Sequence, residues 1–266
     1  TTMSKVFFAD MRASHKENLF DKIAKLLTLC GLAQRVNEGD LTAVKIHFGE
    51  KGNSAFIRPI FARRVVDELK KLGAKPFLTD SSTLYPGERK EAVSALACGI
   101  ENGFAYAVVN APLIISDGLR GVTETTVQVN GELLKEVYIG TEIVEADALV
   151  ALSHFKCHEL TGFGGAIKNL GMGCASRKGK LVQHSTVAPV VTAKHCTGCG
   201  LCIKACAHDA IRIVDGVALI DAVACAGCSR CITVCPTKAV AIQWSEAADL
   251  VMQKMAEYGS GAVANK

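Results

Sequence analysis

Apolar and polar positions follow each other along residues 1–185 in a pattern that predicts alternating strands and helices. Short apolar runs, which have the length of buried strands, alternate with longer stretches whose apolar residues recur every three to four positions. The predicted strands are 5–9, 43–48, 74–79 and 148–152, and the predicted helices are 16–32, 58–72, 88–101 and 142–146. Pro59 lies in the first turn of the second helix, and Gly31 and Gly73 mark the ends of the first two helices. This alternation predicts an α/β domain with an open, mostly parallel sheet.

Further signals predict a hairpin and the organisation of the C-terminal part. Asn130-Gly131 lies between the apolar stretches 126–129 and 134–139, which is typical of a tight hairpin inserted into the domain. Residues 185–192 are rich in valine, threonine and proline and read as a linker. Residues 245–258 predict an amphipathic helix that packs back onto the first domain, and the small residues from Gly259 onward predict a frayed end.

A chain of 266 residues is longer than most single domains and has a length typical of two domains. We predict an α/β domain over residues 1–185, a small α+β domain over 190–244, and a C-terminal helix with a frayed tail over 245–266. The first part is large enough to bury its own core.

Two cysteine runs near the C-terminus carry the clearest chemical signal. The first run is Cys196, Cys199, Cys202 and Cys206, and the second is Cys225, Cys228, Cys231 and Cys235, followed by Pro236. These are eight of the twelve cysteines in the chain, and the runs repeat with a period of 29 residues, from 196 to 225 and from 206 to 235. Between them, the stretches 210–214 and 217–220 flank Asp215-Gly216, which predicts another hairpin.

This spacing resembles that of the two-cluster bacterial ferredoxins, in which the last cysteine of each run crosses to the other [4Fe–4S] cluster. The resemblance implies one cluster on Cys196, Cys199, Cys202 and Cys235, and a second on Cys225, Cys228, Cys231 and Cys206. One departure is Ala207, which stands where the second run has a proline. Zinc sites use paired cysteines without doubled runs of four, and disulfide frameworks belong to small secreted domains. The sequence therefore favours clusters over both.

Composition argues against several classes of partner. The formal charge is only +4, from 30 basic and 26 acidic residues, and no basic stripe or aromatic platform indicates nucleic-acid binding. No apolar run has the length of a membrane span. Thiolate-bound clusters and the lack of an export signal predict a cytoplasmic location.

Polar residues cluster at the ends of three of the predicted strands, where open parallel sheets bind ligands. They are Lys45, His47 and Glu50 at the end of the second strand, Asp80, Ser81 and Ser82 at the end of the third, and the stretches 154–158 and 161–174 after the last. Lys45 and His47 share one face of their strand, which a functional site and an exposed edge strand explain equally well.

The last of these stretches holds the main ligand candidates. Gly162, Gly164 and Gly165 leave backbone amides open before a short predicted helix, and Lys156 and Lys168 add positive charge. A phosphate or carboxylate would suit this place, although glycines before a helix are also common for steric reasons alone.

The remaining histidines and cysteines leave two interpretations open. His154, Cys157 and His158 could bind a metal, but strand-end histidines more often only hydrogen-bond a loop. Cys157 and Cys174 could ligate or react, whereas lone thiols are more often inert. Cys30 and Cys98 lie in apolar helical settings and are predicted to belong to the core.

Segments 44–49, 69–80, 154–158 and 161–171 together resemble the domain-of-unknown-function family 362, whose members often carry a C-terminal ferredoxin-type module. The resemblance covers about residues 1–185, and its most specific part is the stretch Lys168-Asn169-Leu170-Gly171. The family has no settled activity, so the resemblance implies only candidate residues, which are Lys156, His158, Lys168 and Asn169.

The leading hypothesis is an iron–sulfur oxidoreductase with two [4Fe–4S] clusters that relays low-potential electrons to an acceptor or substrate bound by the α/β domain. The candidate catalytic residues are His158 and Lys168, and the candidate binding residues are Lys156, Gly164, Gly165 and Asn169. The expected partners are a redox protein and a small anionic ligand. The alternatives are a non-catalytic electron carrier, a redox sensor, or an assembly factor that docks a partner enzyme. No glycine motif of the nucleotide-binding type supports a flavin or NAD site.

Overall fold

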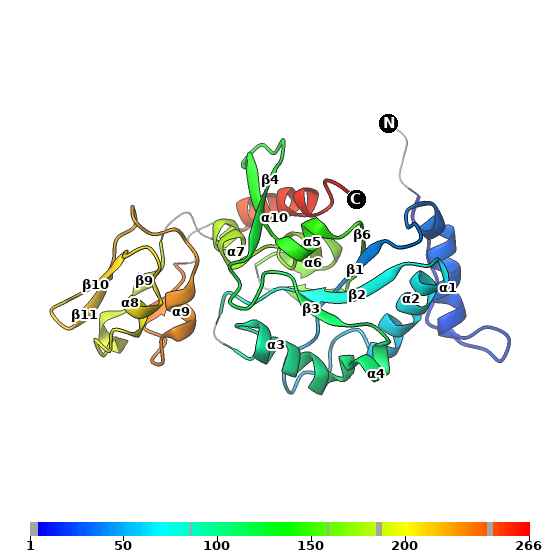
Figure 1. The fold of residues 1–266 in the computed structure, drawn as a ribbon, viewed down its shortest axis with the longest axis horizontal. Helices are drawn as coiled ribbons and strands as arrows, with labels where there is room; N and C mark the ends of the chain where they lie inside the picture. The colour runs from blue at the N-terminus through cyan, green and yellow to red at the C-terminus, as the bar shows by residue number, and fades with distance from the viewer. Residues whose placement is uncertain (1–4, 86, 159, 185–187, 244–246) are drawn as a thin grey trace.

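A four-stranded parallel sheet forms the centre of the α/β body (Figure 1). The computed structural model describes residues 5–85, 87–158, 160–184, 188–243 and 247–266. The strand order is β3-β2-β1-β6, with bounds Leu113–Ile115, Lys75–Asp80, Leu41–Ile46 and Ala148–Leu152, and each strand pairs in parallel with its neighbours. The predicted α/β class with an open parallel sheet is confirmed.

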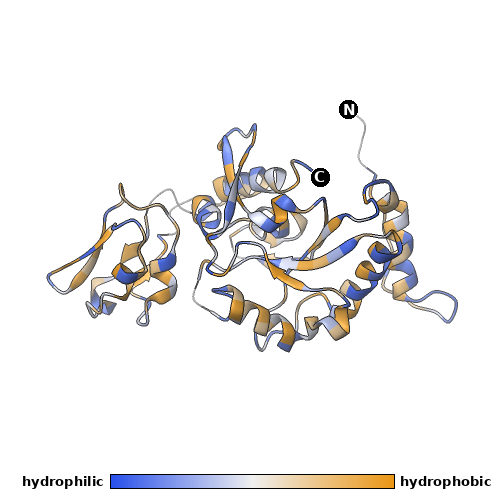
Figure 2. Ribbon diagram, in the orientation of Figure 1, coloured by the Kyte–Doolittle hydropathy of each residue, from blue (hydrophilic) through white to orange (hydrophobic). Residues whose placement is uncertain are grey.

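Helices cover both faces of this sheet (Figure 1). One face packs against α1 (Leu19–Leu29), α2 (Pro59–Lys71), α3 (Ala92–Gly99) and α4 (Tyr106–Val109), with a π-helical turn at Ile100–Phe104. The other face packs against α5 (Thr141–Glu145), α6 (Ala166–Gly171), α7 (Arg177–His184) and α10 (Ala248–Ala262). Val44 and Ile46 of β1 belong to the first core, and Ala43 belongs to the second, because strand side chains alternate between faces. Apolar residues accordingly gather on the strands and on the helix sides that meet them (Figure 2).

Two antiparallel hairpins extend from the α/β body. Strands β4 (Glu124–Gln128) and β5 (Glu136–Gly140) form the hairpin that the sequence predicts around Asn130-Gly131. Strands β7 (Lys156–His158) and β8 (Gly162–Gly164) form a shorter one in the ligand-candidate stretch.

The cysteine runs lie in a small lobe beside the α/β body, which we call the cysteine lobe (residues 188–243; Figure 1). It contains two antiparallel pairs, β9 (Val190–Val191) with β12 (Val240–Ala241) and β10 (Ile211–Val214) with β11 (Val217–Ile220). Its helices are α8 (Leu201–Ala205) and α9 (Arg230–Val234), and short 3₁₀ turns lie at Ala193–His195 here and at Leu32–Gln34 in the body. Asp215 and Gly216 both have positive φ, 48° and 77°, as the predicted tight hairpin turn requires. The domain boundaries predicted at Ser185, Trp244 and Ser245 lie outside the described residues.

The C-terminal helix packs onto the α/β body, as predicted, but the predicted fraying after Gly259 is wrong. Helix α10 continues to Ala262, and Gly259, Gly261 and Ala262 are buried. A Cβ at Gly261 would overlap the Val137 side chain of β5. The small residues therefore allow close packing against β5 and do not mark a loose end.

Two other predictions from the pattern are wrong, and one alternative that the sequence left open is excluded. Residues 5–9 form no strand, and Val6 and Phe8 are exposed. A strand needs a neighbouring strand edge to pair its backbone N–H and C=O groups, and an apolar run alone does not supply one. Cys30 is exposed at the end of α1, whereas Cys98 is buried as expected. The edge-strand explanation of Lys45 fails, since β1 lies between β2 and β6.

Within the described part of the chain, no helix is both long enough and apolar enough to cross a membrane.

Candidate functional site

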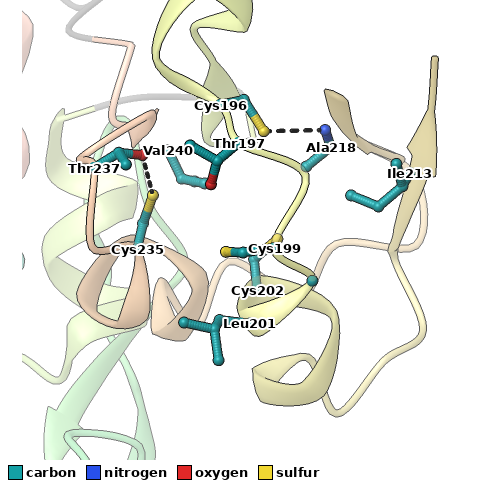
Figure 3. Close-up of a pocket in the computed structure, with 11 residues that line it drawn as sticks. Cys196, Thr197, Cys199, Leu201, Cys202, Ile213, Ala218, Cys235, Thr237 and Val240 are labelled. Carbon is teal, nitrogen blue, oxygen red and sulfur yellow. Dashed lines mark hydrogen bonds between the residues drawn. The ribbon is translucent and has the colours of Figure 1, made fainter. Parts of the chain in front are cut away.

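The eight cysteines of the two runs line two separate hollows of the cysteine lobe. The Cys196 hollow is lined by Cys196, Cys199 and Cys202 of the first run and by Cys235 of the second (Figure 3). The Cys225 hollow is lined by Cys225, Cys228 and Cys231 of the second run and by Cys206 of the first. Their volumes are about 310 Å³ and 330 Å³, including the part open to solvent. In each hollow the fourth cysteine comes from the opposite run, which is the grouping that the crossing pattern predicts.

The 29-residue repeat of the sequence recurs in the backbone. Helices α8 and α9 occupy equivalent positions, since 201 and 205 plus 29 give 230 and 234. Three residue pairs at the same spacing share positive φ, namely Gly198 with Gly227, Gly200 with Ser229, and Asp209 with Lys238. Such left-handed residues between right-handed ones turn successive backbone N–H groups toward one side, which forms a concavity suited to anions and iron–sulfur sites.

Hydrogen-bond donors also point at the cysteine sulfurs. The Ala218 backbone N–H donates to Cys196 Sγ at 3.4 Å, and the Thr237 hydroxyl lies 3.6 Å from Cys235 Sγ (Figure 3). Burial alone would raise the pKa of Cys235, but backbone N–H groups, that of Val240 first, outweigh it and lower the pKa. The surroundings of Cys235 therefore favour a thiolate, the form that binds metals.

Among the described residues, no three histidine, cysteine or acidic side chains converge closely enough to hold one metal ion. A cubane does not require such convergence, because each thiolate binds a different iron atom of the cluster. The cysteine hollows have the ligand type and number for that arrangement.

A second concentration of polar residues lies where the sheet strands end. Lys45 Nζ is 2.9 Å from Asp80 Oδ1, and Arg89 Nη1 is 2.9 Å from Asp80 Oδ2. Arg89 also pairs with Glu50 at 2.5 Å, and Glu50 accepts a hydrogen bond from the Tyr85 hydroxyl. Burial alone would raise the pKa of Asp80, but Lys45 and Arg89 lower it to about 2. Asp80 is thus an anion held between two cations.

Asn169 ties β1 and β6 together at their carboxyl ends. Its amide nitrogen donates to the Lys45 and Leu152 carbonyls and to Ser153 Oγ, and its Oδ1 accepts from Lys45 Nζ at 2.8 Å. In the order β3-β2-β1-β6, this is the point where the direction of strand addition reverses, and open α/β sheets bind ligands there.

Lys180 extends this region from α7. It donates to Ser81 Oγ at 2.6 Å and to the Ala175 carbonyl at 2.5 Å, and burial lowers its pKa to about 8. Nearby, Asp117 accepts from the backbone N–H and hydroxyl of Ser82, and burial raises its pKa. We call Lys45, Glu50, Asp80, Arg89, Asn169 and Lys180 the strand-end network.

His47 follows β1 at the rim of this network. Its Nδ1 accepts from the Gly49 N–H at 2.9 Å, which leaves the proton of the neutral ring on Nε2. Burial first, and then the charge of Arg89, lowers the pKa of His47 to about 4, and Lys156 and Lys45 act in the same direction. At neutral pH, His47 therefore offers an Nε2–H donor within reach of several positive charges.

His184, the last residue of α7, has a lowered pKa like that of His47. Burial lowers its pKa to about 4, with contributions from Lys168, His158 and Lys180. The sequence candidates Lys156, His158 and Lys168 therefore belong to the same electropositive surroundings as His47 and His184.

Of the predicted site residues in the hairpin and α6, Asn169 reaches the sheet, and His158, Gly164 and Gly165 have local contacts. His158 Nδ1 accepts from the N–H groups of Leu160 and Thr161, both at 3.3 Å, and so supports the turn between β7 and β8. Gly164 lies in β8, where a Cβ would come 3.0 Å from the Lys168 stem, and Gly165 precedes α6. Their roles in ligand binding and catalysis stay predictions.

The later glycines of the motif serve close packing. A Cβ at Gly171 would overlap the Met255 carbonyl of α10, and one at Gly173 would lie 2.6 Å from Lys45 Nζ. Gly171 therefore lets α6 pack closely against α10, and Gly173 lets the chain that follows α6 approach Lys45 of the strand-end network.

Sequence reasoning missed Arg89, Asp117, Lys180 and His184, and also Arg177, which lies between the two parts of the molecule. Asp117 follows the three-residue strand β3, which was too short to predict. Arg177, Lys180 and His184 recur at helical spacing just before the predicted linker, and that periodicity was the available signal.

A family model described as "Domain of unknown function (DUF362)" matches residues 42–264. No curated protein matches the chain. Among solved structures, the lactate racemase apoprotein from Thermoanaerobacterium thermosaccharolyticum is similar over 62% of this chain, with 19% identity and a TM-score of 0.43. The chain spans 39% of that structure's length.

Proposed function

Because the chain belongs to the DUF362 family, whose description names no activity, we propose its function from its own residues. We propose an iron–sulfur protein that holds two [4Fe–4S] clusters in the cysteine hollows. These supply one-electron chemistry, and the protein relays low-potential electrons to an acceptor or substrate held by the α/β body.

The observation that carries the proposal is the division of eight cysteines into two hollows with an exchanged fourth member. Cys196, Cys199, Cys202 and Cys235 would hold one cluster, and Cys225, Cys228, Cys231 and Cys206 the other. The repeated left-handed residues suit an anionic centre in each hollow, and the donors to Cys196 and Cys235 support thiolate ligands in the Cys196 hollow.

The strand-end network and the groups around it suit a small anionic acceptor or substrate. Lys156 is exposed near the half-buried His47, whose Nε2–H is a donor, and Lys168 and His158 lie near His184. In this proposal Lys156, Asn169 and the loop at Gly164 and Gly165 bind the anion, and Lys168 and His158 are the candidate catalytic residues. His158 would supply protons as electrons arrive.

The cluster assignment is tested by electron paramagnetic resonance of the reduced, anaerobically purified chain. Cys235→Ala is expected to remove the same signal as Cys199→Ala, and Cys206→Ala the same signal as Cys228→Ala. Cys30→Ala, at an exposed cysteine outside both hollows, is the control and should retain both signals. If Cys235→Ala instead removes the signal that depends on Cys228, the crossed assignment is wrong.

The anion site is tested with inorganic phosphate as the probe, through the rise in melting temperature that binding produces. Lys156→Ala and Lys168→Ala should reduce this rise while both cluster signals persist. Lys51→Ala, at an exposed lysine paired with Glu101, is the matched control. An equal phosphate response in all variants would contradict the anion site.

An exposed aromatic pair favours a second function, that of an electron carrier which docks a partner protein. Phe155 and Phe163 flank the β7–β8 hairpin with ring centroids 5.5 Å apart, and Ile167 is exposed nearby. Exposed apolar patches of this kind often mark protein contacts. In that case Phe155→Ser with Phe163→Ser would abolish electron delivery to the partner, and Lys156→Ala would not.

A further inference from the structure

The Cys225 hollow is the one that adjoins the α/β body. Arg177 begins α7, is 2% exposed, and donates through Nη1 to Thr233 Oγ1 of α9 at 3.3 Å. Its Nε donates to the Thr83 carbonyl at 3.1 Å, and Nη2 donates to the Lys90 carbonyl. Arg177 therefore connects two loops of the body to α9, the helix that contains Cys231 and ends before Cys235.

Apolar contacts reinforce this junction. Leu84 and Leu181 of the α/β body share a core with Cys231 and Ile232 of the cysteine lobe. A Cβ at Gly227, between Cys225 and Cys228, would lie 3.5 Å from Leu181 Cδ2. The loop that carries the Cys225 ligands thus rests on α7.

Helix α7 also links this junction to the strand-end network. Arg177, Lys180 and His184 are spaced by three and four residues and therefore lie on one side of the helix. Arg177 contacts the cysteine lobe, Lys180 reaches Ser81, and His184 lies near Lys168 and His158. One helix spans from the Cys225 hollow to the candidate anion site.

The two hollows differ at positions that the repeat makes equivalent. The Cys225 hollow is lined by Arg230 and His208, and the Cys196 hollow has Leu201 and Thr237 in their places, since 201 and 208 plus 29 give 230 and 237. The Cys196 hollow also includes an exposed cysteine, Cys199, whereas none of the four cysteines of the Cys225 hollow is exposed.

From this asymmetry we infer that Arg230, with Arg177 behind it, makes the centre in the Cys225 hollow the higher-potential member of the pair. The inference rests on the proposed function and adds to it the direction of electron transfer between the two centres. The lower-potential centre, at Cys196, faces the external redox partner, and the centre that retains the electron lies beside α7 and the strand-end network.

The physical reason is electrostatic. Reduction adds one negative charge to a centre, and a nearby guanidinium stabilises that charge. Arg230 lines the hollow and is partly exposed, and Arg177 behind it is held by hydrogen bonds and 2% exposed, where water screens its charge least. Arginine stays charged at any relevant pH, so the effect does not depend on titration. The Cys196 half has Lys204 at the place of Thr233, but Lys204 is exposed and does not line the hollow, so solvent screens its charge.

The test is a potentiometric titration of the intact, anaerobically prepared chain, followed by electron paramagnetic resonance. Two midpoint potentials are expected, and the higher one should disappear in Cys228→Ala and persist in Cys199→Ala. Arg230→Leu installs the residue of the sister hollow and should lower the higher potential alone, so that the two converge. The reciprocal Leu201→Arg, at an exposed position, should raise the lower potential alone.

Arg177→Lys keeps the charge and should shift the higher potential less than Arg177→Gln does, whereas a purely structural role would make both variants equivalent in this readout. If the higher potential belongs to the centre that needs Cys199, or if neither Arg230→Leu nor Leu201→Arg moves a potential, the inference is overturned. Protein that contains no iron would overturn the proposed function itself, which distinguishes the two failures.

Discussion

Lys45 Nζ lies 2.9 Å from Asp80 Oδ1, and the two side chains are only 1% and 6% exposed. They extend from adjacent parallel strands, β1 and β2, at the end where Asn169 and Arg89 add further contacts. Two opposite charges are thus buried at the carboxyl edge of the sheet, where water is excluded and each charge is stabilised by the other.

Lys45→Met is expected to lower the free energy of unfolding by about 3 kcal/mol, because it leaves a buried carboxylate without one of its two cations. Urea unfolding at neutral pH measures the loss. Lys71→Met, which breaks the exposed pair with Glu68, should cost only about 0.5 kcal/mol. Equal losses in the two variants would show that the buried pair does not stabilise the sheet edge.

The stability of the chain should also fall as the pH is lowered from 6.5 toward 4. In the folded state the pKa of His47 is lowered to about 4, so the unfolded chain binds a proton in this window that the folded chain does not. From pH 6.5 to 5 this removes roughly 2 kcal/mol for one such histidine. His184, whose pKa is lowered to about 4 as well, adds to the same slope.

Urea unfolding at pH 7 and pH 5 measures this dependence. His47→Gln should reduce the difference between the two conditions, and His15→Gln, at an exposed histidine, should leave it unchanged. An unaltered slope in His47→Gln would mean that the residue is protonated in the folded protein.

Much of the fold follows from the sequence, because the patterns involved are local. The period of helix α2, the β4–β5 hairpin and the doubled cysteine spacing each follow from neighbouring residues, and the structure contains all three features. The connection of that hairpin differs from a tight Asn-Gly turn, because β4 ends at Gln128, β5 begins at Glu136 and neither Asn130 nor Gly131 has positive φ. Residues 5–9 fail as a strand, since pairing depends on a partner edge that no local pattern describes. The prediction of a frayed end after Gly259 fails for the same reason, because the small size of Gly261 is explained by Val137 on β5, a residue far away in the sequence.

The candidate site was predictable in part. Residues near the carboxyl end of a strand, such as Lys45 of β1 and Asp80 of β2, could be assigned to that edge of the sheet. Arg89 and Lys180 reach the same edge from a loop and from α7, and their contribution becomes visible only once the chain is folded.

Close packing of α10 yields another prediction. Gly171→Ala should destabilise the chain by about 2 kcal/mol or more, since the new methyl group would overlap the Met255 carbonyl in a tightly packed contact. Thermal unfolding of the cluster-loaded protein measures the effect.

The matched control is Gly259→Ala in the same helix contact, where the nearest atoms lie 3.8 Å away. This change should be neutral or stabilise the protein by up to about 1 kcal/mol, because alanine favours a helix over glycine. If both substitutions have the same effect, α10 does not pack on α6 as described.

The central claim is that the eight cysteines of the two hollows hold a pair of iron–sulfur cubanes. The most direct measurement is the iron, sulfide and zinc content of the full chain purified without oxygen. We expect about eight iron and about eight sulfide ions per chain, four of each for every cluster. Zinc in place of iron, or no bound metal in material prepared this way, would contradict the account.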